Sequence, residues 1–137
     1  MKKVIITLVT LLMTISLSSC YDRSVLDDKG LNYFMPVAEN VQYTQQNSTD
    51  VTLTWEIPVE IPEVFKRPIA VQIQVVENDI YKDKITLSNE ETSYSFTIDP
   101  TQRYRYIVKL VGTFTDEAQE KGRTSSVTSE GVVVKVE

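Results

Sequence analysis

Short runs in which apolar and polar residues alternate are the feature that most constrains the fold of this chain. Residues 51–56 read VTLTWE and residues 69–76 read IAVQIQVV, with an apolar side chain at every second position. Successive side chains of a β-strand point to opposite faces, so this period predicts strands that bury one face. Further runs of the same kind bring the number of predicted strands to seven, at residues 41–44, 85–87, 94–98, 104–110 and 132–136.

These runs predict an all-β domain built from two packed sheets. After residue 35, no segment sustains apolar residues at the i, i+3, i+4 and i+7 spacing of an amphipathic helix. A sheet with one apolar face must bury that face against another layer. Seven such strands in about 100 residues therefore predict a seven-stranded antiparallel β-sandwich.

The first 20 residues have the organisation of an export signal. Lys2 and Lys3 precede an apolar stretch at residues 4–17, and two serines then lead to Cys20, the only cysteine of the chain. The stretch is shorter than the roughly 20 residues of a membrane span and contains several threonines. It therefore predicts a signal peptide at residues 1–19.

The end of this signal, Leu17-Ser18-Ser19-Cys20, resembles the lipobox of bacterial lipoproteins. In that family the cysteine carries a diacylglyceryl group, becomes the first residue of the mature chain and is then acylated on its amine. The resemblance implies that Cys20 is lipidated and that this covalent lipid is the protein's only added group. The alternative is an ordinary secretory signal followed by a free or buried cysteine.

Processing at Cys20 would leave an anchored, more acidic protein. Removal of 19 of the 137 residues leaves 118, and the loss of two lysines changes the net charge from -5 to -7. Each buried CH₂ contributes about 0.8 kcal/mol to membrane binding, so two or three acyl chains hold a protein on a bilayer. Residues 20–35 show neither helical nor strand periodicity and are predicted to form a tether between the lipid and the domain at residues 36–137.

Two motifs of this domain resemble the fibronectin type III family. The sequence STDVTLTWEIP at residues 48–58 resembles the second strand of that family, which ends in a core tryptophan followed by prolines. Ile98, Pro100 and Tyr104 have the spacing of its tyrosine corner, although the glycine usual after that proline is Thr101 here. The resemblance implies a sandwich of fibronectin type III or immunoglobulin-like topology.

On this template Trp55, Pro100 and Tyr104 have structural roles. Trp55 shares a face with Val51 and Leu53 and is expected to fill the core, whereas Pro100 ends a strand because it has no N–H to donate. The Tyr104 ring is expected to be buried while its hydroxyl bonds back to the loop. The template predicts strands at residues 38–45, 50–57, 69–77, 82–87, 93–98, 103–113 and 127–136.

The composition excludes several kinds of chemistry. A chain with no His and one Cys lacks histidine bases and ligands, and can form neither an internal disulfide nor a cysteine-rich zinc site. The 14 Lys and Arg are outnumbered by 19 Asp and Glu and form no basic run. This pattern argues against nucleic-acid binding, which needs clustered positive charge.

Adjacent carboxylates are the remaining catalytic option, since two acids can hydrolyse a glycosidic bond. Such residues are ordinarily solvated charges, and a small sandwich offers no deep cleft in which burial could raise a carboxyl pKa. We therefore expect the protein to be no enzyme and to bind no metal. The acid pairs lie in the predicted tether or in loops: Asp27-Asp28, Glu90-Glu91 and Asp116-Glu117.

Two surfaces are candidates for binding. The template places the connections at residues 57–68 and 114–126 at one pole, where Phe65, Lys66, Arg67 and Phe114 would offer aromatic and charged groups on stiff loops. The alternative is that Phe65 and its apolar neighbours Val59, Ile61 and Val64 cover the end of the core. The second surface is the outer sheet face with Val76, Ile107, Val111 and Val133, which residues 31–34 are expected to cover.

The whole-chain pattern resembles small lipoproteins of unknown function from Bacteroides-type bacteria. That resemblance implies an outer-membrane lipoprotein and leaves open which side of the membrane it occupies. We expect a non-catalytic cell-envelope module that contacts another envelope protein or acts as a spacer. The alternative is a surface glycan-binding lipoprotein that assists polysaccharide capture, with Phe65 and Phe114 stacking on sugars.

Overall fold

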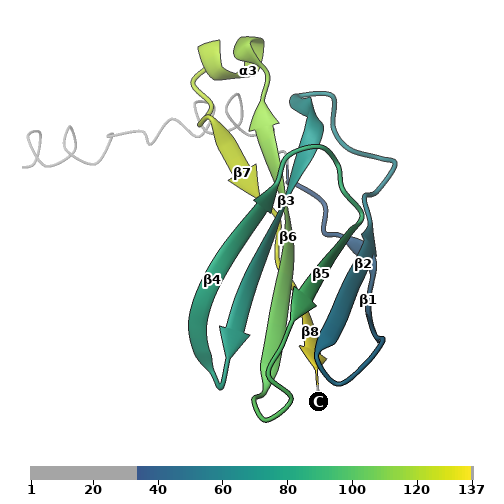
Figure 1. The fold of residues 1–137 in the computed structure, drawn as a ribbon. Coiled ribbons are helices and arrows are strands. Elements are labelled where there is room, and N and C mark those ends of the chain that lie inside the picture. The colour runs from purple at the N-terminus through teal and green to yellow at the C-terminus, as the bar shows by residue number, and fades with distance from the viewer. Residues whose placement is uncertain (1–33, 137) are drawn as a thin grey trace, which may run out of the picture. The chain divides into compact units, whose positions relative to one another are not determined.

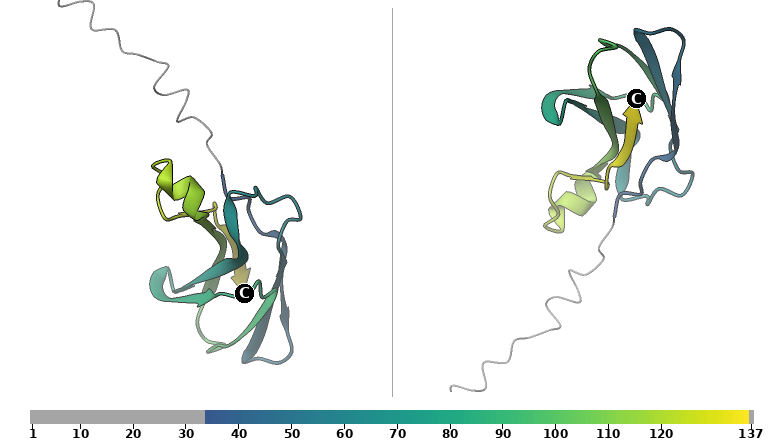
Figure 2. Two further views of the ribbon diagram at one scale, coloured as in Figure 1. Left: turned by 90° about the horizontal axis from the view of Figure 1, so that it is seen from above. Right: turned by 90° about the horizontal axis from the view of Figure 1, so that it is seen from below.

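A computed structural model describes residues 34–136, which form two antiparallel sheets packed face to face (Figures 1 and 2). The first sheet has the order β1-β2-β5, with β1 at Glu39–Gln45, β2 at Asp50–Glu56 and β5 at Ser93–Thr97. The second has the order β4-β3-β6-β7, and β8 also pairs with β6. Its strands are β3 at Phe65–Glu77, β4 at Ile80–Leu87, β6 at Tyr104–Phe114, β7 at Ser126–Thr128 and β8 at Val132–Val136.

The predicted all-β antiparallel sandwich is therefore confirmed, with two corrections to its strands. β3 begins at Phe65 rather than at residue 69, because the pairing with β6 continues through an irregularity between Lys66 and Ala70, where Pro68 has no N–H to donate. The predicted last strand at 127–136 is two strands, β7 and β8, separated by residues 129–131. A five-residue helix, α3 at Asp116–Glu120, lies between β6 and β7.

The predictions for the N-terminal segment lie outside the described residues. These are the signal peptide at residues 1–19, the lipidation of Cys20 and the tether as far as residue 33. Within the described part, Phe34 is exposed whereas Met35 is buried. No helix between residues 34 and 136 is long and apolar enough to cross a membrane.

The core follows the alternation seen in the sequence. In β6, every second residue from Tyr104 to Phe114 faces inward, and β3 alternates in the same way from Ile69 to Val75. These side chains meet those of β2, where Val51 and Leu53 are fully buried. Burial of a side chain of this size stabilises a fold by about 1.5–3 kcal/mol, so the alternation itself drives the two layers together.

Trp55 and Tyr104 are both buried, and the polar atom of each side chain is hydrogen-bonded to the backbone. The Trp55 ring is buried, and its Nε1–H donates to the carbonyl of Glu91 at 2.8 Å. The Tyr104 hydroxyl accepts a hydrogen bond from the backbone N–H of Asp99 at 3.2 Å, across the turn that contains Pro100. Thr101 stands in this turn where the fibronectin type III family usually has glycine. The Asp99 carboxylate holds Thr101 in place, because it accepts hydrogen bonds from the N–H and the hydroxyl of Thr101.

Tyr106 is a polar exception inside the core. Its ring is fully buried and lies 4.5 Å from the Phe96 ring, centroid to centroid. Its hydroxyl has no hydrogen-bond partner among the described residues. Burial strongly raises the pKa of this phenol, so the hydroxyl stays neutral.

Candidate functional site

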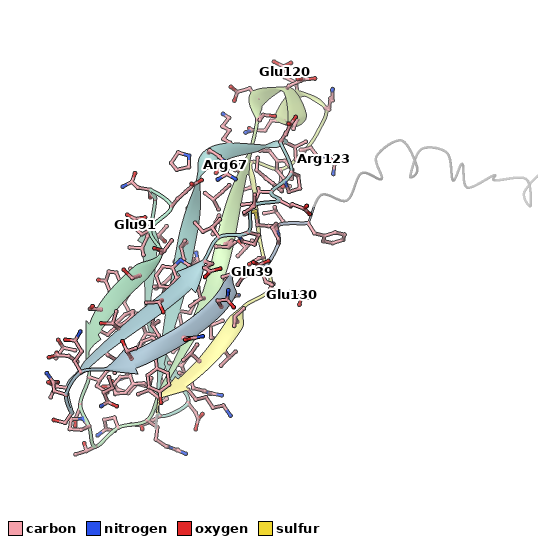
Figure 3. All side chains as sticks on the ribbon, turned by 90° about the vertical axis from the view of Figure 1, so that its right-hand side faces the viewer. Glu39, Arg67, Glu91, Glu120, Arg123 and Glu130 are labelled. Carbon is pink, nitrogen blue, oxygen red and sulfur yellow. The ribbon has the colours of Figure 1, made fainter. Side chains whose placement is uncertain are left out.

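Three connections meet at one pole of the sandwich, including the two that the template placed there. They are residues 57–64 before β3, residues 88–92 before β5 and residues 115–125, which include α3. Figure 3 shows Arg67, Glu91, Glu120 and Arg123 at this end of the domain. Residues 34–38 lead into β1 from the same end (Figure 1).

The two aromatic residues predicted to bind a ligand at this pole are buried. Phe65 and Phe114 are each 4% exposed, and their ring centroids lie 4.9 Å apart. The Met35 sulfur also lies here, close to Gly112 and the Phe65 ring. Neither aromatic ring can stack on a sugar in this arrangement. Phe65 therefore closes the end of the core, and the expectation of two exposed stacking rings was wrong.

The two cations predicted beside them are held in ion pairs. Lys66 Nζ lies 2.6 Å from Asp116 Oδ1, and Arg67 lies 2.7 Å from Glu90 Oε1. These pairs join the start of β3 to α3 on one side and to the β4–β5 connection on the other. Both cations thus form ion pairs between the segments of this pole, so neither is unpaired for a ligand.

Glu90 has a structural task in this arrangement. Its φ of 55° lies in the left-handed region, and its Oε1 accepts from the Ile69 backbone N–H at 2.9 Å as well as from Arg67. These bonds reach the irregular stretch of β3, where the sheet ladder is interrupted. The Ile69 N–H, assisted by Arg67, lowers the pKa of the Glu90 carboxyl.

Two carboxylates near this pole, Glu91 and Glu117, have pKa values shifted in the wrong direction for a general acid. A general acid in glycoside hydrolysis needs a raised pKa. Hydrogen bonds from the Asn89 backbone lower the pKa of Glu91, and the Lys121 side chain lowers that of Glu117. Among residues 34–136, no group of three or more His, Cys, Asp or Glu is placed to hold a metal ion.

The outer face of the larger sheet is the second predicted surface, and its apolar residues do point away from the core. Val76, Ile107 and Val111 are half-buried, and Val133 is 52% exposed. The expected cover by residues 31–34 is wrong for Phe34, whose side chain is 75% exposed. Residues 31–33 lie outside the described part of the chain.

This outer face is also basic, which the sequence reasoning missed. Arg105 is directly opposite Lys135 on β8, and Lys84 on β4 is opposite Gln74 on β3. Because alternate residues share a face, Lys109 lies on the same side as Arg105. The outward strand positions of this sheet beyond the irregularity in β3 thus carry four cations and neither Asp nor Glu. Only strand register shows this, because the four residues come from three separate strands. A fifth outward cation, Lys66, lies opposite Thr113 near the loop pole and is paired with Asp116.

A shallow depression of about 200 Å³ lies at the end of this face, at the pole opposite the loops. Asp79 at its edge pairs with Arg105 at 2.6 Å and with Arg103 at 3.5 Å. The turn that carries Asp79 is fixed, since Asn78 exchanges hydrogen bonds with Arg103 and bonds to Gln102. The depression is lined by Asp79, Arg103, Tyr104, Arg105, Lys135 and Val136.

Comparisons with known proteins give one family match. The model of a family described as "Domain of unknown function (DUF4945)" matches residues 20–136. No curated protein matches the chain. Among solved structures, a crystal structure of the FN5 domain of Drosophila Lar is similar at 16% sequence identity and a TM-score of 0.38, over 72% of this chain and 92% of that one.

Proposed function

The chain belongs to the DUF4945 family, a family of domains of unknown function, and we propose that it is a non-catalytic, membrane-anchored module of the bacterial cell envelope. In this proposal the sandwich domain contacts another envelope protein. The observation that carries the proposal is the open outer face of the β4-β3-β6-β8 sheet, where cations and apolar side chains occupy adjacent outward positions.

The anchoring part rests on the sequence around Cys20. The lipobox resemblance makes Cys20 the first residue of the mature protein, and the family match also begins at residue 20. An acylated Cys20 would hold the domain on the outer membrane through its covalent lipid. Within the described residues, the chain enters the domain at the loop pole (Figure 1).

The non-catalytic part rests on the carboxylates. The pKa is lowered for four carboxyl groups between positions 34 and 136: Glu90, Glu91, Asp99 and Glu117. Lowered values keep these groups ionised at neutral pH and unsuited to donate a proton. The glycan-binding alternative is not favoured, because Phe65 and Phe114, its proposed stacking residues, are buried.

Anchoring is tested by incorporation of radiolabelled palmitate into the full chain in a bacterial host, followed by membrane fractionation. We expect label in the wild type, none in Cys20→Ala, and recovery of the wild type with the outer membrane. Labelling that persists in Cys20→Ala would overturn the lipidation site.

Protein contact is tested by photo-cross-linking in the cell from position 133 on the outer face. Position 59 is the matched control, since Val59 is 93% exposed but lies in the loop before β3. We expect one stoichiometric envelope protein to be captured from position 133 and not from position 59. Capture of nothing from position 133, or of the same proteins from both positions, would contradict a specific contact.

A further inference from the structure

The charges of the domain are separated by face. The mature chain is predicted to carry a net charge of -7, yet beyond the irregularity in β3 the outward positions of the larger sheet hold Lys84, Arg105, Lys109 and Lys135 without an acidic residue. Mixed signs are the usual composition of a protein surface. A face of one sign, opposite to the net charge of the molecule, creates a local positive potential that attracts anionic partners.

Three of the four cations of this face have no ion-pair partner among the described residues, whereas Arg105 pairs with Asp79. Between residues 34 and 136, Lys84, Lys109 and Lys135 form no ion pair. Two other lysines on strands of this sheet do form ion pairs: Lys66 with Asp116, and Lys82 with Glu77 at 3.2 Å. Three ammonium groups on one sheet face therefore remain available to a ligand.

The register places two of the positive charges against each other. Arg105 and Lys135 are directly opposite across β6 and β8, an arrangement that destabilises a sheet. Asp79 offsets part of the Arg105 charge at 2.6 Å, but it is also shared with Arg103. An anionic group bound beside Lys135 would remove the remaining repulsion, so the depression at this end of the sheet is suited to a carboxylate.

Apolar side chains lie between the cations. Ile107 is opposite Val133 in the next row of the same two strands, and Val76 is opposite Tyr81, which is 56% exposed. Lys109 lies four residues beyond Arg105 on β6, which separates their α-carbons by about 13 Å. A partner that matches this face therefore needs carboxylates about 13 Å apart with an apolar side chain between them.

We propose that this outer face, named the basic face and defined by Lys84, Arg105, Ile107, Lys109, Val133 and Lys135, docks an acidic protein segment that also carries apolar side chains. A protein segment fits better than an acidic polysaccharide because the apolar row of Ile107 and Val133 would be left without a partner on a sugar acid chain. The proposal rests on the module function proposed above and names the chemistry of its partner.

Two synthetic polypeptides test the proposal with the full chain in detergent micelles. Poly-L-glutamate supplies carboxylates alone, and a random copolymer of glutamate and tyrosine supplies carboxylates with apolar rings. We expect the copolymer to bind more tightly than poly-L-glutamate. Binding of both should weaken with added salt, because exposed charges are screened beyond about 8–10 Å at physiological ionic strength.

Matched variants assign the binding to the basic face. The double variant Lys109→Gln with Lys135→Gln should lower the affinity for both polymers about tenfold, because two charges that contact the polymer are lost. Neither substitution breaks an ion pair among the described residues. Lys121→Gln with Arg123→Gln removes the same charge from the connection between α3 and β7, at the loop pole, and should change affinity less than about twofold. Val133→Thr should weaken the copolymer alone, about threefold.

The outcomes separate this proposal from the function on which it rests. It is overturned if neither polymer binds, if both double variants lose equal affinity, or if polygalacturonate binds more tightly than the copolymer. In each of these cases, palmitate labelling at Cys20 and a protein captured from position 133 would leave the anchored module intact. Loss of the captured protein as well would overturn the protein contact itself.

Discussion

The hydroxyl of Ser129 accepts a hydrogen bond from the backbone N–H of Leu110 at 2.9 Å, in the gap between β7 and β8. The Ser129 backbone N–H in turn donates to the Leu110 carbonyl at 2.8 Å. Two further residues, Glu130 and Gly131, separate Ser129 from the start of β8. Ser129 therefore supplies with its side chain the acceptor that a continuous strand would have supplied with its backbone.

Replacing Ser129 with alanine should destabilise the domain. The substitution leaves the buried N–H of Leu110 without its acceptor, which costs about 1–3 kcal/mol. Urea denaturation of Ser129→Ala should show a lower midpoint with an unchanged slope. Ser126→Ala, an exposed serine on β7, is the control and should change little. Equal midpoints for wild type and Ser129→Ala would show that water replaces the hydroxyl.

The same region shows where sequence reasoning about the fold ends. The alternation of apolar residues specifies which side of each strand is buried, and it predicted seven strand locations from local pattern alone. The position of a strand break such as the one at Ser129 depends on which residue of β6 lies opposite. The sequence of one strand alone does not determine this register. The predicted last strand was therefore continuous where the structure has β7 and β8.

The candidate surfaces were predicted less well, for a related reason. Phe65 and Phe114 belong to segments that look like loop ends in the sequence, and only their pairing across β3 and β6 brings the two rings together inside the core. The basic face also depends on pairing, since Arg105 and Lys135 are 30 residues apart in the chain but directly opposite in the sheet. Local patterns thus predict burial better than they predict neighbours.

Tyr104 and Tyr106 should respond differently to the same substitution. Tyr104→Phe removes the acceptor of the Asp99 N–H and should destabilise the domain by about 0.5–1.5 kcal/mol. Tyr106→Phe removes a buried hydroxyl that has no partner in the described part of the chain, and it should be neutral or stabilising. Thermal or urea unfolding of both variants provides the comparison. Destabilisation by Tyr106→Phe as large as that by Tyr104→Phe would mean that the hydroxyl has a water or protein partner.

Glu90 should make the domain less stable in acid. Its pKa is lowered in the folded protein, first by the Ile69 N–H and then by Arg67, so its carboxylate contributes stability above the unfolded-state pKa of about 4.3. That contribution is lost as the pH falls through the lower folded-state pKa. The unfolding midpoint of Glu90→Gln should therefore fall less between about pH 6 and about pH 3 than that of the wild type.

The control for this titration is Glu60→Gln, at an exposed position of the loop before β3. It should keep the pH dependence of the wild type. A direct measurement is the carboxyl pKa of Glu90 by NMR, which should lie below the ordinary value of a glutamate side chain. A parallel loss of stability in wild type and Glu90→Gln would assign the acid sensitivity to other carboxylates.

Gly112 permits the close packing of Phe65 and Met35 at the loop pole. A β-carbon at this position would lie 2.6 Å from Phe65 Cδ1 and 2.8 Å from the Met35 sulfur, both closer than real contacts allow. Gly112→Ala should therefore cost about 1–3 kcal/mol through overpacking, whereas Thr113→Ala, at the exposed neighbouring position, should cost less. In a Phe65→Leu background the cost of Gly112→Ala should shrink, because the nearest ring atoms are gone. Urea denaturation of the four variants of this cycle measures the coupling, and additive costs would show that Phe65 does not set the size limit at Gly112.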